Sequence, residues 1–354
     1  MAHKIDLVMD FQYGSTGKGL IVGYLAKREN YDTAICAFAT NAGHTYIDGS
    51  FHVMTQQLPV AAVVSKSVTR VLIGPGSAIH APTLEGELLR YAPHLHGKRV
   101  MIHPQAAVVE QYHMTSEITS GRTKIGSTGK GVGEAYVERI HRHPTDHNTV
   151  KNRWGNDHPL HRFVVTEDEY RDALDRAQSI IIEGAQGFSL SMYHGQYPYT
   201  TSRDVTPMQI AADCGLPFQM TPYIQVIGTL RTFPIRVNNR DGSSGPCYPD
   251  QHEISWSDIG VAPELTTVTK LPRRVFTFSH QQLRDAMWHC GGYWHTRLFL
   301  NFCNYLKNAN LFRSSRPVQD LIDQIQAPGS SALNPPHVEW LGWGPSDQDV
   351  RTAA

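Results

Sequence analysis

The alternation of apolar and polar residues along the chain predicts strands that alternate with helices. Short apolar runs are typical of buried strands, and apolar residues every three or four positions are typical of helices that cover a sheet. The runs predict strands at residues 5–9, 33–39, 70–73, 99–103, 179–182, 223–229 and 297–302, and helices at 20–28, 82–91, 167–177, 206–214 and 281–289. This order favours an α/β fold with a mostly parallel central sheet flanked by helices.

Two polar stretches interrupt this pattern. Residues 239–245 contain Asp-Gly-Ser-Ser-Gly, and residues 327–336 are rich in Pro, Gly, Ser and Asn, so both predict loops. Neither is typical of a linker between independent units. The sequence therefore predicts a single domain over 1–354 with loop and small subdomain insertions. No apolar run is long enough to cross a membrane, and the first residues lack the apolar core of a signal peptide.

The hexapeptide Gly-Ser-Thr-Gly-Lys-Gly occurs twice, at residues 14–19 and 126–131. Glycine lets backbone N–H groups turn toward an anion, and lysine adds a positive charge. The first copy lies between a predicted strand and a predicted helix, where a phosphate can bind the helix N-terminus. It is not a Walker A motif, because Gln12 and Gly19 stand where Gly and Ser or Thr are needed. Each copy also has the composition of an ordinary turn, but the pair indicates two phosphate-binding loops.

Charge and cysteine content narrow the class of protein. The formal net charge is zero, which argues against a basic face that grips a nucleic acid polymer, so a bound nucleotide is expected to be a small molecule. The five cysteines are dispersed, which favours reduced thiols in a cytoplasmic protein and indicates neither a zinc site nor disulfides.

The first hexapeptide resembles the Gly-Asp-Glu-Gly-Lys-Gly signature of adenylosuccinate synthetases. Further blocks match this family in the same order, and they spread over nearly the whole chain. They are Asn-Ala-Gly-His-Thr at 41–45, Ile-Gly-Ser-Thr-Gly-Lys-Gly-Val-Gly at 125–133, Glu-Gly-Ala-Gln-Gly at 183–187, the segment 194–202, Thr-Thr-Val-Thr at 266–269 with Arg273 and Arg274, and Gly344-Pro345. The chain is therefore identified as a member of this family, with its P-loop-like fold.

The resemblance implies a ligase reaction in three parts. A base removes the N1 proton of a 6-oxopurine nucleotide, a nucleoside triphosphate phosphorylates O6, and the amino group of L-aspartate displaces that phosphate at C6. Such a reaction needs one site for the purine 5′-phosphate, a second for the triphosphate with Mg²⁺, and a third for aspartate.

The family's roles transfer to matching positions of this chain. The catalytic residues would be Ser15, Lys18 and His44, and Mg²⁺ would be bound by Ser15 and Gly43. The purine nucleotide would bind Ser15, Asn41, Ser127, Thr128, Arg142, Gln186 and Thr201, with Arg142 contributed by the other subunit of a homodimer. The triphosphate would bind Gly14, Thr16, Gly17, Lys18, Gly19, Gly43, His44, Thr45, Asn304 and Gly344, and aspartate would bind Thr267, Val268, Thr269 and Arg273.

The first departure from the family is Ser15, which replaces the aspartate that serves relatives as general base and Mg²⁺ ligand. A serine hydroxyl is a poor base near neutral pH, so N1 deprotonation could fall to His44, to a Mg²⁺-bound water or to the phosphate of the substrate. Serine is also smaller and uncharged. Together with Gly23, which replaces an acidic residue, it would leave room for the 2-amino group of guanine.

Two more departures concern the sugar and the phosphate donor. Leu271 replaces an arginine that lies near the ribose hydroxyl in relatives, which favours a 2′-deoxy sugar, although Lys270 could supply the missing charge. Asn304 replaces the aspartate that reads the guanine of GTP, and Phe302 replaces a lysine with a stacking surface. An amide pairs more naturally with adenine, so we expect ATP or dATP as donor.

These departures resemble the phage branch of the family, which converts dGMP toward diaminopurine deoxynucleotides. The predicted function is a ligase that joins L-aspartate to C6 of dGMP with ATP or dATP, through a 6-phosphoryl intermediate, giving 2-amino-2′-deoxyadenylosuccinate. One alternative is an ordinary adenylosuccinate synthetase that uses IMP and GTP, and another is a non-catalytic nucleotide-binding protein. A GTP-dependent switch is disfavoured, because it would carry a true P-loop and Asn-Lys-x-Asp.

Overall fold

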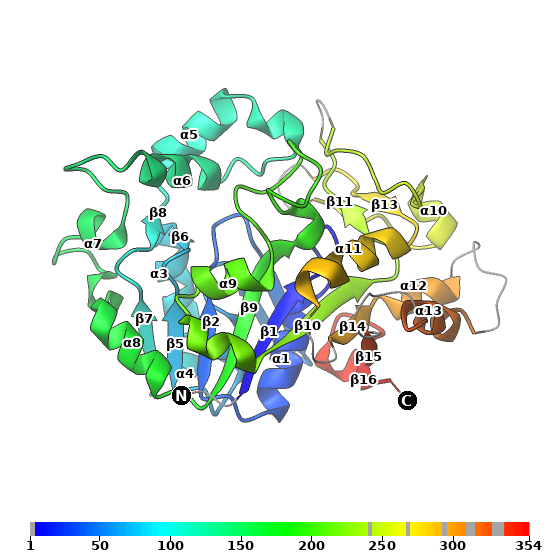
Figure 1. Ribbon diagram of the computed structural model, residues 1–354, viewed down its shortest axis with the longest axis horizontal. Helices are drawn as coiled ribbons and strands as arrows, with labels where there is room; N and C mark the ends of the chain where they lie inside the picture. Colours follow the sequence, from blue (N-terminus) through cyan, green and yellow to red (C-terminus); the bar gives the residue numbers. More distant parts are fainter. Residues whose placement is uncertain are drawn as a thin grey trace.

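The computed structural model describes residues 4–239, 243–266, 270–291, 296–308, 316–327 and 336–353. Its centre is a nine-stranded sheet in the order β16-β15-β14-β10-β1-β9-β2-β5-β7 (Figure 1). All neighbouring strands are parallel except β15 and β16. The strands are β1 (Lys4–Asp10), β2 (Thr33–Cys36), β5 (Arg70–Ile73), β7 (Arg99–Ile102), β9 (Ser179–Gly187), β10 (Ile224–Arg231), β14 (Arg297–Asn301), β15 (His337–Gly342) and β16 (Val350–Thr352).

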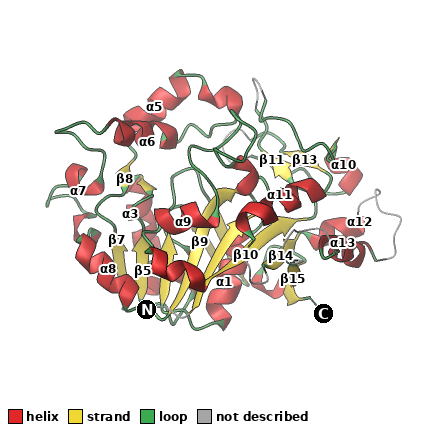
Figure 2. Cartoon of the chain, in the orientation of Figure 1, coloured by secondary structure: helices red, strands yellow, loops and turns green. Residues whose placement is uncertain are grey.

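Helices lie on both sides of this sheet (Figure 2). The described helices are α1 (Lys18–Arg28), α2 (Val60–Val64), α3 (Ala81–Arg90), α4 (Ala92–Leu95), α5 (Gln111–Thr119), α6 (Val132–His141), α7 (Val150–Arg153), α8 (Glu167–Asp175), α9 (Pro207–Asp213), α10 (Trp256–Ile259), α11 (His280–Cys290), α12 (Cys303–Asn308) and α13 (Pro317–Ile325).

The central strands are buried on both faces. In β1, Ile5, Leu7 and Met9 belong to one core cluster, which includes residues of α8, α9, α11 and α13. Val8 belongs to the opposite cluster, which includes residues of α1, α2 and α3. Successive side chains of a strand point to opposite faces, so an uninterrupted apolar run is what a strand covered on both sides requires. The predicted α/β fold with a mostly parallel sheet is confirmed.

In the upper part of Figure 1, α5 and α6 lie on one side and β11 and β13 on the other. Smaller β elements accompany the central sheet. They include two parallel two-residue strands, a hairpin and a three-stranded antiparallel sheet. These are β6 (Ala78–Ile79) with β8 (Ala107–Val108), β3 (His44–Asp48) with β4 (Phe51–Thr55), and β11 (Ile235–Arg236), β13 (Arg274–Phe276) and β12 (Glu253–Ile254).

Most predicted boundaries lie within three residues of the observed ones. The strand predicted at 179–182 continues as β9 to Gly187, and the strand predicted at 33–39 ends as β2 at Cys36. Of the two predicted loops, 243–245 has no regular structure, while 240–242 and 328–335 lie outside the described residues. None of the described helices is both long and apolar enough to span a membrane.

Candidate active site

The carboxyl ends of the central parallel strands carry most of the predicted site residues. The first hexapeptide follows β1, the segment 37–45 follows β2, and Gln186 lies near the end of β9. Arg231 ends β10, and Phe302 directly follows β14. Because the carboxyl ends of parallel strands share one edge of a sheet, these segments meet there, which is where ligands bind in open α/β sheets.

The first hexapeptide forms a tight loop that leads into α1. Gly14, Ser15 and Gly17 have φ angles of 104°, 57° and 95°, in the left-handed region. Gly17 is the N-cap of α1 and packs so closely against the Asn301 amide that a Cβ would collide with it. The loop therefore requires glycine at this position, and the N-terminal N–H groups of α1 are available to an anion.

A buried carboxylate that the sequence pattern did not indicate lies beneath this loop. Asp10 is fully buried, and one of its oxygens accepts the backbone N–H groups of Gln12 (2.7 Å) and Gly14 (3.3 Å). The other oxygen accepts the Thr16 hydroxyl and lies 3.4 Å from the Lys18 ammonium. Asp10 thus shapes the loop and balances the charge of Lys18. In the sequence, the one feature that could have indicated Asp10 was an acidic residue at the end of a predicted apolar strand.

Lys18 also links the first loop to two residues predicted to hold the purine 5′-phosphate. Its ammonium donates to the backbone oxygen of Gln186 at 3.0 Å. The Gln186 side chain donates in turn to the Asn41 amide oxygen at 3.1 Å. The structure therefore brings Lys18, Asn41 and Gln186 together from three separate segments.

His44 is buried against a glutamate and an aromatic ring. Its Nδ1 lies 2.7 Å from Oε1 of Glu183, and its ring stacks on Phe38 with 4.3 Å between centroids and 11° between planes. The two atoms are within ion-pair distance, but Glu183 Oε1 has no hydrogen-bond partner among the described residues. Gly19 packs against the His44–Thr45 backbone, so this segment and the first loop lie side by side. Glu183 was part of a matched block but had not been predicted as a site residue.

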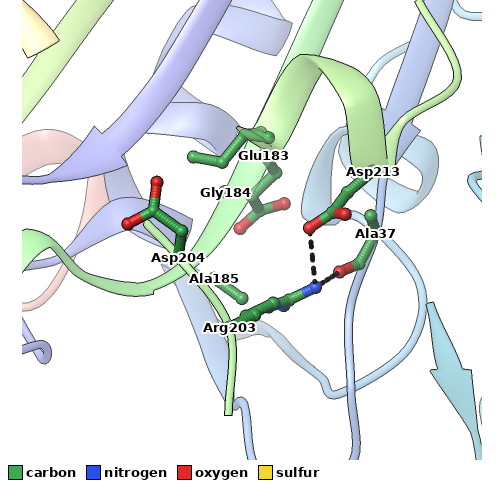
Figure 3. A pocket seen from close by; sticks show the side chains of 8 residues that line it. Ala37, Glu183, Gly184, Ala185, Arg203, Asp204 and Asp213 are labelled. Atoms are coloured by element: carbon green, nitrogen blue, oxygen red, sulfur yellow. Dashed lines mark hydrogen bonds and ion pairs between the residues drawn. The ribbon is translucent and has the colours of Figure 1, made fainter. Parts of the chain in front are cut away.

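Behind Glu183 lies a small cavity, shown in Figure 3. Its volume of about 10 Å³ corresponds to one water molecule, so it is no nucleotide site. Arg203 donates to the Ala37 carbonyl at 2.7 Å and lies 3.4 Å from Asp213, whose pKa is raised by burial. This polar cluster supports the end of β9 that carries Glu183 and Gln186.

The second hexapeptide is also built on a buried carboxylate. Glu117 of α5 accepts the Ser127 hydroxyl and the backbone N–H of Gly131, the N-cap of α6. The Thr40 hydroxyl donates to the Lys130 carbonyl at 3.0 Å, and Gly133 packs directly against Ser202. The loop that carries Ser127 and Thr128 therefore lies beside the segments that carry Asn41 and Thr201.

Arg142 is separated from this loop. It follows α6 as its C-cap, is exposed, and has a φ angle of 52°. A ten-residue helix spans about 15 Å, so Arg142 lies roughly that far from the loop at the other end of α6. The structure does not bring Arg142 to the phosphate-binding loops of its own chain.

An arginine-rich cluster lies next to Ser15. The fully buried guanidinium of Arg231 donates to the Ser15 carbonyl at 3.1 Å and forms an ion pair with Glu264. Arg273 lies nearby, and its guanidinium makes no hydrogen bond or ion pair within the described part of the chain. Burial lowers the pKa of Arg273. The other predicted aspartate-binding residues (Thr267, Val268 and Thr269) lie outside the described residues.

The predicted donor-base residues follow β14. The Asn304 amide oxygen is buried and has no hydrogen-bond partner among the described residues. Phe302 lies under the Arg231 guanidinium, 3.8 Å from ring centroid to Cζ. The Asn301 amide donates to the Thr16 carbonyl at 3.2 Å, and Asn301 also packs against Gly342, two residues before Gly344. Asn301 thus joins the first loop, the donor-base segment and the predicted Gly344 loop.

Gly23 has a different role from the one expected. Within α1 it packs directly on the ring of Tyr46, and a Cβ there would collide with that ring. Tyr46 is buried and donates to Asp347 at 2.9 Å. The missing side chain therefore makes room for Tyr46, and the interpretation of Gly23 as space for a purine is corrected.

A family model described as adenylosuccinate synthetase matches residues 7–160 and 147–308. The chain therefore belongs to the adenylosuccinate synthetase family, and it is an enzyme of this family of C–N bond-forming ligases.

Within the family, the chain is similar to phage enzymes. It is 44% identical over 350 residues to the N6-succino-2-amino-2′-deoxyadenylate synthase of Vibrio phage phiVC8, covering 98% of this chain and 97% of the relative. It is 41% identical over 365 residues to the synthase of the same name from Salmonella phage PMBT28, with the same coverage. A solved structure of the cyanophage S-2L succinoaminodeoxyadenylate synthetase, bound to dGMP and to dATP as an energy donor, matches with a TM-score of 0.89. That match has 39% identity and covers 99% of this chain and 96% of the other. The resemblance to the phage branch is confirmed.

Proposed function

We propose that this enzyme joins L-aspartate to C6 of dGMP, with ATP or dATP as phosphate donor, to give 2-amino-2′-deoxyadenylosuccinate. The observation that carries this proposal is Ser15, which is exposed at the carboxyl edge of the sheet, in the loop that leads into Lys18 at the start of α1. A neutral, short side chain at this place accommodates the 2-amino group of guanine, which the carboxylate of other relatives would crowd. The phage relatives, named for the corresponding product, support the same acceptor.

The 5′-phosphate of dGMP would bind the second glycine loop. Thr128, Asn41, Gln186 and Thr201 supply hydroxyl and amide donors there, in adjacent segments. Ser127 lies in the same loop, and its hydroxyl donates to Glu117 in the free enzyme. The triphosphate would bind at the N-terminus of α1, with the remaining glycines of the first loop, Thr16 and Thr45 around it. Lys18, which pairs with Asp10 in the free enzyme, would donate to the transferring phosphoryl group.

The donor base would be adenine. Asn304 carries a buried amide oxygen without a partner among the described residues, and this oxygen can accept the 6-amino group while the amide nitrogen donates to N1. Guanine presents an acceptor at C6 and a donor at N1, so it would need the reverse arrangement. The cyanophage structure, whose energy donor is dATP, supports this choice.

Aspartate would bind Arg273. Its guanidinium is mostly enclosed and unpaired within the described residues, and a planar guanidinium matches a carboxylate through two parallel hydrogen bonds. Thr267, Val268 and Thr269 would complete this site. Leu271, in place of an arginine, has no polar group to offer a ribose hydroxyl, which favours the deoxy sugar.

Mg²⁺ would accompany the triphosphate. The Ser15 hydroxyl and the Gly43 carbonyl belong to exposed residues of two adjacent loops, and hard oxygen donors of this kind fit an ion held mainly by phosphates and water. No cluster of three or more His, Cys, Asp or Glu side chains within the described ranges is placed to bind a metal by itself. When bound, Mg²⁺ would neutralise phosphate charge during phosphoryl transfer.

The active enzyme would be a homodimer. Arg142 lies far from the loops of its own chain, so it can serve a 5′-phosphate only in a second copy. Near it, α5 and α6 expose four apolar side chains (Tyr112 47%, Ile118 55%, Val137 38% and Ile140 70%), a surface that a partner subunit would cover. An Arg142→Ala variant mixed with a Lys18→Ala variant would recover activity if each site used both chains.

An isotope experiment tests the reaction. The enzyme would be incubated with dGMP labelled with ¹⁸O at C6, L-aspartate, dATP and Mg²⁺, and the products analysed by mass. A 6-phosphoryl intermediate requires the label to leave with inorganic phosphate, and the nucleotide product to gain the mass of aspartate less water. Succinylated product with unlabelled phosphate would refute the phosphorylation step, and no succinylated product would refute the function.

A further inference from the structure

Two arginines lie around one glutamate at the carboxyl end of β10. Both terminal nitrogens of Arg231 contact the Glu264 carboxylate, the first at 3.3 Å. The Tyr305 hydroxyl donates to the same carboxylate at 3.1 Å. Arg273 lies close enough for its charge to act on this pair, but it forms no ion pair with it. The cluster therefore carries two positive charges and one negative charge.

The Arg231 guanidinium is occupied by contacts within the protein. It is fully buried, and besides Glu264 it contacts the Ser15 carbonyl and the Phe302 ring. It thus joins segments predicted to bind the purine, the donor base and aspartate. A guanidinium enclosed in this way is not free to bind a substrate, so its effect is exerted through Glu264.

Backbone hydrogen bonds fix the position of Arg273, whereas its side chain makes no hydrogen bond or ion pair within the described residues. Its N–H donates to the Glu264 carbonyl at 2.7 Å, and its carbonyl accepts the Trp256 indole N–H at 2.7 Å. The backbone of Arg273 is therefore fixed beside Glu264, while its guanidinium has no hydrogen-bond or ion-pair partner in the described ranges.

We infer that Arg231 is a positioning residue for aspartate binding, because it occupies the Glu264 carboxylate and so keeps the neighbouring Arg273 available to the substrate. This inference rests on the proposed function, in which Arg273 binds an aspartate carboxylate. The net charge of one positive unit in the cluster then matches one substrate carboxylate.

The physical reason is the cost of a partly buried charge that loses its counter-charge. Without Arg231, the Glu264 carboxylate, whose side chain is 26% exposed, would keep the Tyr305 hydroxyl as its side-chain donor among the described residues, and partial burial disfavours a carboxylate without a counter-charge. Arg273 is the next nearby cation whose charge acts on Glu264. Pairing of Arg273 with Glu264 would relieve this cost and would remove Arg273 from the aspartate site.

Steady-state kinetics of matched variants test this inference. Arg231→Gln removes the charge, and we expect it to raise KM for aspartate by about tenfold or more, equivalent to about 1.4 kcal/mol of lost binding. KM for dGMP should change much less. The double variant Arg231→Gln/Glu264→Gln removes both charges, leaves Arg273 unpaired, and should return KM for aspartate to near the wild-type value.

Two further variants separate a positioning role from a merely structural one. Arg231→Lys keeps the positive charge beside Glu264, so KM for aspartate should stay near the wild-type value. The planar contact with Phe302 is lost in this variant. Arg297→Gln breaks a similar two-point pair with Glu339, at the opposite end of β14, and should also leave KM for aspartate unchanged.

Three results would overturn the inference. They are an unchanged KM for aspartate in Arg231→Gln, equal increases in KM for all three substrates, and failure of the double variant to recover. If Arg231→Gln does not fold, Arg231→Lys and the double variant carry the test, since a tenfold increase in either contradicts the charge argument. A wild-type enzyme that consumes no aspartate would instead refute the proposed function.

Discussion

Replacement of Asp10 by asparagine should destabilise the protein markedly, because it removes the counter-charge of a buried lysine. Asp10 is fully buried, and Lys18 exposes only 8% of its surface. Removal of one partner from a buried ion pair costs about 3–5 kcal/mol. Lys18 keeps the Gln186 carbonyl at 3.0 Å, so we expect a loss near the lower limit, about 3 kcal/mol in the free energy of unfolding.

The same helix offers a matched control. Lys27, near the other end of α1, pairs with Asp48 at 2.7 Å, but their side chains are 37% and 30% exposed. Exposed pairs contribute about 0–1 kcal/mol, so Asp48→Asn should change stability by less than about 1 kcal/mol.

Urea unfolding followed by circular dichroism measures both effects. The Asp10→Asn loss should persist between low and high salt, because buried pairs are screened little, whereas any Asp48→Asn loss should shrink as salt rises. Equal losses for the two variants, or an Asp10→Asn loss below about 1 kcal/mol, would refute the role of Asp10 as the counter-charge of Lys18.

Three further predictions concern the site and the pH dependence of stability. Lys18→Ala should abolish turnover, seen as loss of phosphate release, while dGMP still binds in a calorimetric titration; near-normal turnover would remove Lys18 from the phosphoryl site. Glu117→Gln should raise KM for dGMP by about tenfold, because the second loop loses a charged acceptor for Ser127 and Gly131, and an unchanged KM would contradict this role. Burial lowers the pKa of His103 from 6.5 to about 4, so the unfolded chain binds the proton first and stability should fall as pH drops from about 6.5 toward 4. Since the ring is partly exposed, we expect a loss of about 1 kcal/mol between pH 7 and 5 from this group, reduced in His103→Asn; an equal loss in the variant would argue against His103 as its source.

The apolar pattern predicted the central sheet well because its strands are buried on both faces. β5 has the predicted boundaries, since Arg70–Ile73 ends where the apolar run ends. β9 was predicted too short, because Glu183 interrupts the apolar run at a buried position. The structure accommodates this carboxylate next to His44 and the Val60 N–H, contacts that lie far away in the sequence.

The candidate site divides in a similar way. Lys18, Asn41 and Gln186 could be predicted from short motifs, and the structure brings them together. Glu183 and Arg231 could not be predicted as site residues, because each acts through partners that the fold supplies, and the one signal for Asp10 was its place at the end of an apolar strand. Arg231, for example, contacts Ser15 across 216 positions and Glu264 across 33. Single-residue patterns carry no signal for such pairs.

A competition among acceptors tests the central claim most directly. Equimolar dGMP, GMP and IMP would be incubated with L-aspartate and Mg²⁺, with either dATP or GTP, and the succinylated products would be identified by mass. The account predicts a dominant product derived from dGMP, formed with dATP. A dominant product derived from IMP, formed with GTP, would contradict it and would make this chain an ordinary adenylosuccinate synthetase with serine at position 15.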